Sequence, residues 1–195
     1  MKRVFDIVLA SVGLVLASPI LLFMIIWVRL DSKGLAIFRQ QRVGRGEKLF
    51  EIWKIRTMYL GVEGPFISPK GDERVTRAGR VLRRSKLDEL PQLWNVLRGD
   101  MSLVGPRPEV PKYVAHYSKD ERAVIFALRP GITNPGSILF FDEPEWLAEQ
   151  ADPEAAYINE LLPKKLECYR RYAREQSMLL DLKVLLRTLW RLIAE

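Results

Sequence analysis

An apolar stretch near the N-terminus constrains this 195-residue chain more than any other feature. From Ile7 to Val28 there are 22 consecutive uncharged, mostly apolar residues. A straight helix of this length would measure about 33 Å, which is enough to cross the hydrocarbon core of a bilayer. We therefore expect this segment to lie in a membrane.

The dipeptide Ser18-Pro19 lies in the middle of the stretch. Proline removes a backbone donor and disfavours helix at the residue before it, so the two halves could bend back to one membrane face. Positive charge at both ends, such as Lys2 and Lys33, favours a cytoplasmic location for both. The sequence thus predicts a re-entrant helix-break-helix. A kinked spanning helix and a cleaved signal peptide are the alternatives.

Composition narrows the chemistry of the rest of the chain. Thirty-one Lys and Arg against 24 Asp and Glu give a net charge of +7, which indicates a polyanionic partner: nucleic acid, anionic lipid or a phosphorylated substrate. The single cysteine, Cys168, excludes an internal disulfide and a multi-cysteine zinc site. The single histidine, His116, lies in a polar stretch and is interpreted as an ordinary surface residue.

The pattern after the apolar stretch predicts an α+β fold in which helices surround a small β-hairpin. Strands are expected at 35–40 and 48–57 around a basic, glycine-containing turn, and residues 61–71 are expected to form a surface loop. Further elements are predicted as helices at 73–84, 91–98, 117–128 and 153–175 (interrupted at Pro163), and as a short extended piece at 101–104.

Two predicted helices have distinctive apolar faces. In helix 91–98, Leu93, Trp94 and Leu97 are expected to face the core. The last helix, 177–193, has a broad leucine face with basic residues opposite. That face suits either the core or a membrane interface, and both alternatives stay open.

Two adjacent carboxylates, Asp88 and Glu89, precede Pro91 in this basic chain. Neighbouring residues on a helix diverge by about 100°, so the pair cannot line one narrow slot and would serve two different partners. The simplest structural interpretation is a helix start, in which Ser85 to Asp88 form a variant of the capping box.

The surrounding cations favour a catalytic interpretation instead. Arg83 and Arg84 lie just upstream of the pair, while Arg107 and Arg129 occupy proline-containing turns. A cationic pocket that contains one or two carboxylates is what Mg²⁺-dependent attack on a phosphoanhydride requires, with one carboxylate as the nucleophile.

Four segments of the chain resemble the bacterial sugar transferases, small monotopic phosphoglycosyl transferases that load a lipid carrier. The segments are "KRVFDIVLA…SPI", "FRQQRVGRGEKLFEIWKIRTM", "LRRSKLDELPQLWNVLRGDMSLVGPRPE" and "LRPGIT", in the order seen in the family. The resemblance covers nearly the whole chain. It implies a re-entrant anchor at residues 1–33, followed by a cytoplasmic catalytic domain at 34–195 with amphipathic interfacial helices near the C-terminus.

The resemblance also implies an activity. Members transfer a sugar-1-phosphate, usually from a UDP-sugar, to polyprenyl (undecaprenyl) phosphate and release UMP at the cytoplasmic face of the bacterial inner membrane, the first membrane step of polysaccharide or exopolysaccharide synthesis. By resemblance, Asp88 is the nucleophile that forms a phosphoglycosyl-aspartate and contacts Mg²⁺, and Glu89 is the base or a second Mg²⁺ contact. The other implied substrate-binding residues are Lys54, Arg56, Arg83, Arg84, Pro106, Arg107, Pro108 and Arg129.

The expected partners are a UDP-sugar, polyprenyl phosphate and membrane phospholipids, with no nucleic acid; a homodimer stays open. One segment departs from the family: "NPGSILFFDEPEWL" (134–147) follows "RPGIT", where many members have a different sequence. We expect it to touch the sugar or shape its entrance. The alternatives are a non-catalytic, membrane-anchored basic binding protein and an inactive relative that serves as a scaffold.

Overall fold

The computed structural model describes residues 1–194, with side chains through residue 191. Helices surround two small sheets, which confirms the mixed helical and sheet character predicted from the sequence. The strands are β1 (Ile37–Val43), β2 (Leu49–Ile55), β3 (Ser102–Val104) and β4 (Gly131–Thr133). The helices are α1 (Lys2–Asp31), α2 (Arg77–Arg84), α3 (Gln92–Arg98), α4 (Pro111–Val114), α5 (Lys119–Ile125), α6 (Pro135–Leu139), α7 (Glu143–Ala148), α8 (Pro153–Ala156), α9 (Leu162–Glu175) and α10 (Met178–Ala194), with short turns η1 (Arg45–Glu47), η2 (Leu87–Glu89) and η3 (Tyr157–Leu161).

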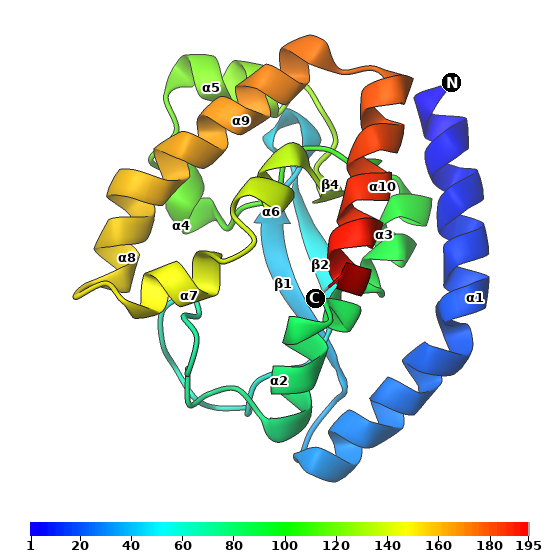
Figure 1. The fold of residues 1–195 in the computed structure, drawn as a ribbon, viewed down its shortest axis with the longest axis vertical. Coiled ribbons are helices and arrows are strands. Elements are labelled where there is room, and N and C mark those ends of the chain that lie inside the picture. The colour runs from blue at the N-terminus through cyan, green and yellow to red at the C-terminus, as the bar shows by residue number, and fades with distance from the viewer. Residues whose placement is uncertain (195) are drawn as a thin grey trace.

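The predicted hairpin is confirmed. Strands β1 and β2 pair antiparallel from Ile37 opposite Ile55 to Val43 opposite Leu49, and they lie at the centre of the molecule (Figure 1). Ile52 is buried and Phe50 packs against the same core cluster, as expected for residues two apart on a strand.

Strands β3 and β4 form a second sheet, which is parallel, so both strands start at the same edge. Ser102 pairs with Gly131 and Val104 pairs with Thr133. The carboxyl end of β3 leads directly into the turn that contains Arg107.

The N-terminal segment is one continuous helix, α1, with Pro19 inside it, so the predicted break is wrong and a bend takes its place (Figure 1). Pro19 has no N–H to donate to the carbonyl of Val15, four residues earlier. The Ser18 hydroxyl donates to that carbonyl at 2.7 Å. The helix remains intact because the side chain satisfies the acceptor that the proline abandons.

Both ends of α1 are fastened to the rest of the molecule. Near its start, the buried Asp6 carboxylate accepts hydrogen bonds from the Ser102 hydroxyl at 2.9 Å and the Leu103 amide at 3.2 Å. Near its end, Asp31 accepts a hydrogen bond from the Ala78 amide at 3.1 Å. Along its length α1 contributes to two core clusters, through Ala10 in one and Met24 and Val28 in the other.

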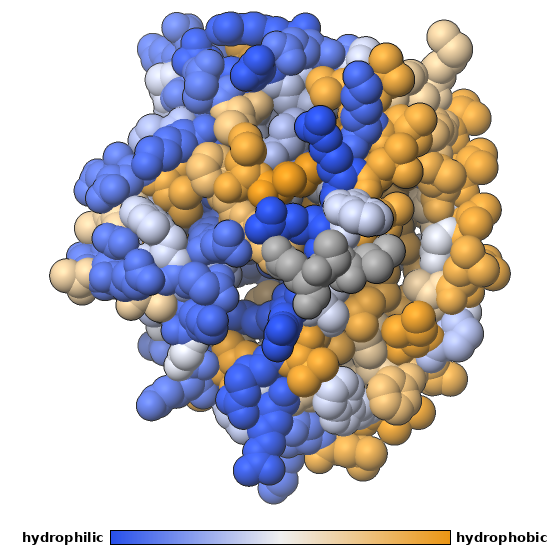
Figure 2. Space-filling model, in the orientation of Figure 1, coloured by the Kyte–Doolittle hydropathy of each residue, from blue (hydrophilic) through white to orange (hydrophobic). Residues whose placement is uncertain are grey.

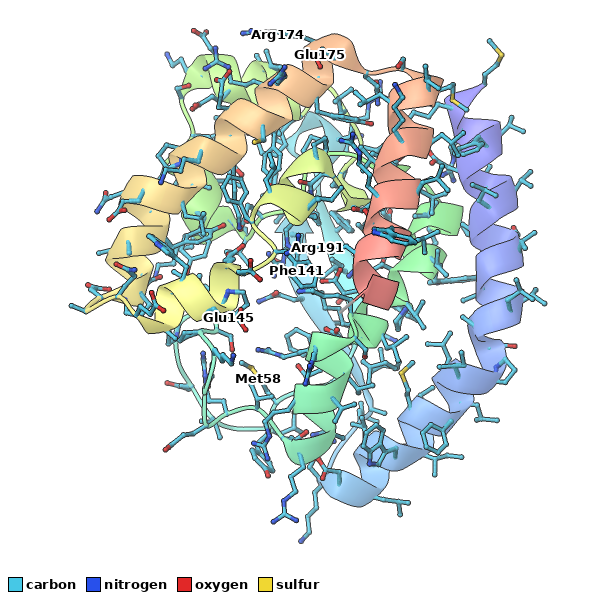
Figure 3. All side chains as sticks on the ribbon, viewed as in Figure 1. Met58, Phe141, Glu145, Arg174, Glu175 and Arg191 are labelled. Atoms are coloured by element: carbon cyan, nitrogen blue, oxygen red, sulfur yellow. The ribbon has the colours of Figure 1, made fainter. Side chains whose placement is uncertain are left out.

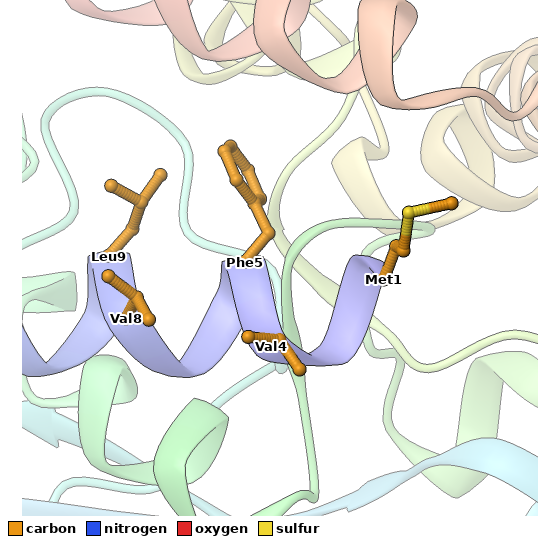
Figure 4. Close-up of a pocket in the computed structure, with 5 residues that line it drawn as sticks. All are labelled: Met1, Val4, Phe5, Val8 and Leu9. Carbon is orange, nitrogen blue, oxygen red and sulfur yellow. The ribbon is translucent and has the colours of Figure 1, made fainter.

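The outer face of α1 is apolar and exposed. Among the described residues, α1 is the one helix long and apolar enough to cross a membrane by length and composition. Figure 2 shows a continuous hydrophobic surface over this side of the molecule. Near the start of α1, Met1, Val4, Phe5, Val8 and Leu9 line an open apolar hollow of about 510 Å³ (Figure 4).

Helix α10 has one side buried in the core and one apolar side exposed; whether the exposed side lies in a membrane interface stays a prediction. Asp181 and Val184 are buried against the body, whereas Leu182, Leu186 and Trp190 are exposed. One side of α10 is therefore core, and the other extends the apolar surface that α1 begins.

Two local predictions are corrected. Trp94 does not face the core: it is exposed, and the buried face of α3 consists of Gln92, Asn95 and Val96. Pro163 does not interrupt the helix: it lies at the start of α9, directly after the π-helical turn η3, and the backbone on both sides of it is helical. The helical path from α8 to α9 continues through the π-helical turn η3.

Candidate active site

The acidic pair lies in a single 3₁₀ turn, η2, between α2 and α3. The chain enters this turn through Lys86, whose backbone is left-handed (φ 54°). Ser85 ends α2, and its hydroxyl donates to the Val81 carbonyl at 2.9 Å. The capping-box interpretation of Ser85 to Asp88 is therefore wrong, since Ser85 terminates one helix rather than starting the next.

Glu89 joins two distant parts of the chain. Its Oε1 atom accepts from Lys54 Nζ at 2.7 Å and from Arg107 Nη2 at 2.9 Å. Lys54 is on β2 and Arg107 is in the turn after β3. The structure thus brings together Lys54, Glu89 and Arg107, three of the residues predicted from the sequence.

The Pro106-Arg107-Pro108 turn is held by both sheets. The Gly131 amide donates to the Pro106 carbonyl at 2.8 Å, and Arg42 Nη1 on β1 donates to the Pro108 carbonyl at 3.1 Å. Prolines on either side restrict the backbone at Arg107. The guanidinium therefore approaches Glu89 from a fixed position.

Gly105 makes this arrangement sterically feasible. A Cβ atom at this position would lie 2.3 Å from the Arg129 carbonyl oxygen. Only glycine lets β3 and the start of β4 approach so closely.

Asp88 differs from its neighbour in having no partner. It is 7% exposed, and within residues 1–194 no hydrogen bond or ion pair engages its carboxylate. Burial raises the pKa of Asp88 above its ordinary value; the nearby Lys54, Arg83 and Lys86 oppose this effect, and the Glu89 charge adds to it. The result is a carboxylate whose oxygens are not committed to the protein.

The pKa of Glu89 moves in the opposite direction. Burial favours its neutral form, but the charges of Arg107 and Lys54 outweigh burial and lower the pKa of Glu89 well below its ordinary value. Two adjacent acids whose pKa values are pushed apart typically have different roles. Glu89 is a fixed anion, whereas Asp88 is free to react or to bind a cation.

Arg83 lies on the other side of Asp88. Its Nε atom donates to the Thr57 hydroxyl at 2.8 Å and its Nη1 atom to the Ser68 hydroxyl at 2.6 Å. Burial lowers the pKa of Arg83, and Asp88 is the first of the charges that counter this effect. Arg83 therefore belongs to the same cationic cluster and also connects it to the predicted surface loop.

Three predicted substrate-binding residues lie elsewhere. Arg84 is exposed on α2. Arg56 is buried and donates to the Leu35 carbonyl at 2.7 Å and the Ser32 carbonyl at 2.9 Å, so it caps the end of α1. Arg129 donates to the Gly99 carbonyl at 2.9 Å, and its charged neighbours include Arg3 and Arg45 rather than Asp88 and Glu89.

Sequence reasoning missed Arg42 and Lys86 as residues of the site. Burial lowers the pKa of Arg42, and Glu109, Arg107 and Glu89 are among the charges that act on it. Two features of the sequence could have identified them: Arg42 lies in the basic "QQRVG" segment, and Lys86 lies two residues before Asp88. The left-handed backbone of Lys86 had no signal in the sequence.

The donor set fits a magnesium ion only in part. In the portion of the chain that the structure describes, no three His, Cys, Asp or Glu side chains gather closely enough to hold a metal. Mg²⁺ is commonly bound by one or two carboxylates together with substrate phosphates and water. The Asp88 carboxylate, which the protein leaves uncommitted, fits that mode, with Glu89 beside it.

The segment 134–147 contacts Lys86, which precedes the acidic pair: Lys86 Nζ lies 5.5 Å from the centroid of the Phe141 ring. Figure 3 shows Phe141 beside Arg191 near the middle of the molecule, with Glu145 on α7 and Met58 after β2 around the same region. The space-filling view shows an opening there, surrounded mainly by hydrophilic residues (Figure 2).

Comparison with known proteins identifies the family to which the chain is similar. The family model described as "Bacterial sugar transferase" matches residues 1–195. A UDP-glucose:undecaprenyl-phosphate glucose-1-phosphate transferase of Caulobacter vibrioides is 40% identical over 191 residues, covering 96% of this chain and 67% of the relative. A transferase of the same name from Escherichia coli is 36% identical over 195 residues, covering 98% of this chain and 40% of the relative.

A third relative has a different sugar in its name. A UDP-N-acetylgalactosamine-undecaprenyl-phosphate N-acetylgalactosaminephosphotransferase of Aeromonas hydrophila is 42% identical over 136 residues, covering 68% of this chain and 32% of the relative. The chain thus spans about two fifths or less of two of these relatives. Because the family model matches the entire sequence, the chain belongs to the bacterial sugar transferase family.

Proposed function

We propose that this protein transfers a sugar-1-phosphate from a UDP-sugar to undecaprenyl phosphate and releases UMP. The observation that supports this proposal most directly is Asp88, a buried carboxylate that has no hydrogen-bond or ion-pair partner among the described residues and whose charge is affected by Lys54, Arg83 and Lys86. The relatives' names, which specify undecaprenyl-phosphate sugar phosphotransferases, support the same substrates.

The first step is attack by an Asp88 oxygen on the β-phosphorus of the donor. A new oxygen–phosphorus bond forms, the bond between the β-phosphorus and the bridging oxygen breaks, and UMP leaves with that oxygen. In the second step, a phosphate oxygen of undecaprenyl phosphate attacks the same phosphorus. The Asp88 carboxylate is released, and the product is a sugar diphospholipid.

The cations around the pair lower the cost of bringing these anions together. Lys54 and Arg107 are fixed by Glu89, so their remaining N–H groups are already oriented when the diphosphate arrives. Bound Mg²⁺, held by Asp88 and Glu89 together with diphosphate oxygens, would supply further charge screening. The low pKa of Glu89 favours its role as an orienting anion over that of a general base.

The covalent phosphosugar–Asp88 intermediate is tested by mass spectrometry of protein mixed with the UDP-sugar donor alone. We expect a phosphosugar on Asp88 in active protein and none in Asp88→Asn. An active enzyme in which residue 88 stays unmodified would overturn the covalent mechanism. A non-catalytic basic binding protein would instead bind the anionic donor equally or more tightly after Asp88→Asn.

Glu89→Gln separates the two roles of Glu89. If the variant forms the adduct but fails to pass it to lipid, Glu89 is the base for the second step. If adduct formation is also lost, Glu89 orients the cations or contacts the metal, which is the result we expect.

We also propose that α1 enters the membrane from the cytoplasmic face and returns to it. This proposal is supported by the contacts at its two ends, Asp6 with Leu103 and Asp31 with Ala78, which join the same body. A helix that crossed the bilayer would leave its ends on opposite sides. Residues 1–33 would then form the membrane-inserted part and residues 34–195 the catalytic part, working in bacterial polysaccharide synthesis at the inner membrane.

A further inference from the structure

The segment 134–147 contributes an aromatic ring beside the acidic pair. Lys86 Nζ lies 5.5 Å from the centroid of the Phe141 ring, and Arg191 lies over the same ring at 4.8 Å. Lys86 is two residues before Asp88, and its charge acts on both Asp88 and Glu89. The ring therefore contacts a cation whose charge acts on both carboxylates, without itself belonging to the charged cluster.

The same segment contributes a carboxylate from another direction. Glu143 Oε2 pairs with Lys165 Nζ at 2.6 Å, and the exposed fractions of the two side chains are 25% for Glu143 and 6% for Lys165. The pKa of Arg107 is raised chiefly by Glu89, and Glu143 contributes to the same effect. Glu143 is thus held by a buried lysine, is near enough for its charge to act on Arg107, and is still open to solvent.

The structure of a UDP-sugar explains why an apolar ring and a carboxylate are needed near Asp88. The sugar is joined to the β-phosphate by one oxygen, so when that phosphate is at Asp88 the sugar lies within a few ångströms of it. Sugar rings present apolar C–H faces and hydroxyl donors, and binding sites combine an apolar surface with a few placed polar groups. An aromatic ring and a partly exposed carboxylate meet both requirements.

We propose that Phe141 and Glu143 form the subsite that recognises the hexose of the UDP-sugar donor. Glu143 accepts hydrogen bonds from sugar hydroxyls through oxygen atoms that Lys165 keeps in place. Phe141 packs against the ring. This inference rests on the proposed function and assigns donor selectivity to the segment that departs from the family pattern.

Donor selectivity provides the test. Wild type, Glu143→Gln and Phe141→Leu are assayed for UMP release with UDP-glucose, UDP-galactose and UDP-N-acetylgalactosamine, and kcat/KM is compared between donors. Glu149→Gln is the matched control, because Glu149 is an exposed carboxylate at the end of the same helix, α7. Inhibition by UMP, which lacks the sugar, is measured in parallel.

We expect Glu143→Gln to change the ratio of kcat/KM between the best and second donors by about 10-fold or more, since a hydrogen bond to a charged group is at stake. Inhibition by UMP should stay within about twofold of wild type, as should every parameter of the control. Phe141→Leu should raise KM for all the sugars without changing UMP inhibition.

A purely structural role for the Glu143–Lys165 ion pair makes a different prediction. Activity would then fall equally with all donors, and UMP inhibition would weaken along with it. An unchanged donor ratio in Glu143→Gln, at any level of activity, would overturn the subsite. If wild type releases UMP from no donor, the proposed function itself fails, and that result is distinct from an unchanged ratio in an active enzyme.

Discussion

Arg107 donates to Glu89 Oε1 at 2.9 Å, across 18 residues of sequence, and this bond joins the turn after β3 to the turn that contains Asp88. Lys54 donates to the same oxygen from β2. Glu89 Oε1 thus joins β2, the turn after β3 and its own turn η2, and neither of these two cations is hydrogen-bonded to Asp88. Glu89 therefore positions the cations, whereas the Asp88 carboxylate remains available to react.

Asp88→Asn is expected to abolish turnover while stabilising the protein. Because the folded-state pKa of Asp88 is raised, its ionised form at neutral pH costs folding free energy, and the neutral amide avoids this cost. Each kcal/mol recovered should raise Tm by about 2–4 °C. Thermal unfolding in detergent at pH 7 measures the change, with the exposed Asp120→Asn as control. A lower Tm would contradict the electrostatic account of Asp88.

Glu89→Gln is expected to destabilise the protein in a pH-dependent way. The folded-state pKa of Glu89 is lowered, so its contribution to stability is fully present above the ordinary glutamate pKa of about 4.3 and is lost as the pH falls below it. At pH 7 we expect a loss of about 1–3 kcal/mol, since Lys54 and Arg107 lose a charged acceptor. Unfolding of both proteins from pH 7 to pH 3.5 should show the difference shrinking at the acid end. A constant difference would mean that the charge of Glu89 is not the cause.

Ser68→Ala is expected to loosen the surface loop while leaving the rest of the fold intact. The Ser68 hydroxyl accepts from Arg83 at 2.6 Å and donates to Asp72 at 2.7 Å, and so connects the loop to the site. Burial favours neutral Asp72, but hydrogen bonds from Arg74 and Ser68 outweigh it and lower the pKa of Asp72 to about 2, so this carboxylate remains an acceptor at neutral pH. Limited trypsin cleavage at Lys70 should accelerate severalfold with Tm nearly unchanged. Equal cleavage rates would show that the bridge does not hold the loop.

Both ends of α1 are expected to be labelled from the cytoplasmic side. Single cysteines are placed by Lys2→Cys and Lys33→Cys in a Cys168→Ser background and treated with a membrane-impermeant maleimide in intact cells and inverted vesicles. Arg174→Cys, on the exposed surface of α9, is the cytoplasmic reference. Labelling should occur only in inverted vesicles for all three. Labelling of residues 2 and 33 from opposite sides would contradict the re-entrant proposal.

The sequence was sufficient to predict the hairpin, because alternating residues such as Phe50 and Ile52 reveal which face of a strand is buried. It misled at Arg56, which is two residues after Lys54 and should share its face. The Arg56 amide still donates to the Ala36 carbonyl at 2.7 Å, but its guanidinium donates to the Leu35 and Ser32 carbonyls and so binds the end of α1. The partners of a side chain at the end of a strand depend on tertiary contacts that periodicity does not contain.

Arg129 shows how topology overrides motif similarity. Both Arg107 and Arg129 precede a proline, yet Arg107 follows β3 and Arg129 precedes β4. The turn after β3 folds back on the start of β4, where the Gly131 amide donates to the Pro106 carbonyl. The two side chains nevertheless have different partners, because Arg107 donates to Glu89 and Arg129 donates to the Gly99 carbonyl. Pairing direction for strands of three residues could not be derived from the sequence.

Helix α1 cannot be deleted without exposing part of the hydrophobic core. Met24 and Val28 pack with Ile55, Ala78 and Leu82 in one core cluster, so a shortened protein that starts after Asp31 would expose the interior side of α2 to water. Efforts to obtain a water-soluble enzyme by deleting the first 31 residues should yield aggregates. Replacing the outward-facing leucines and valines of α1 with polar residues, while leaving its inner side intact, is the route that the packing permits.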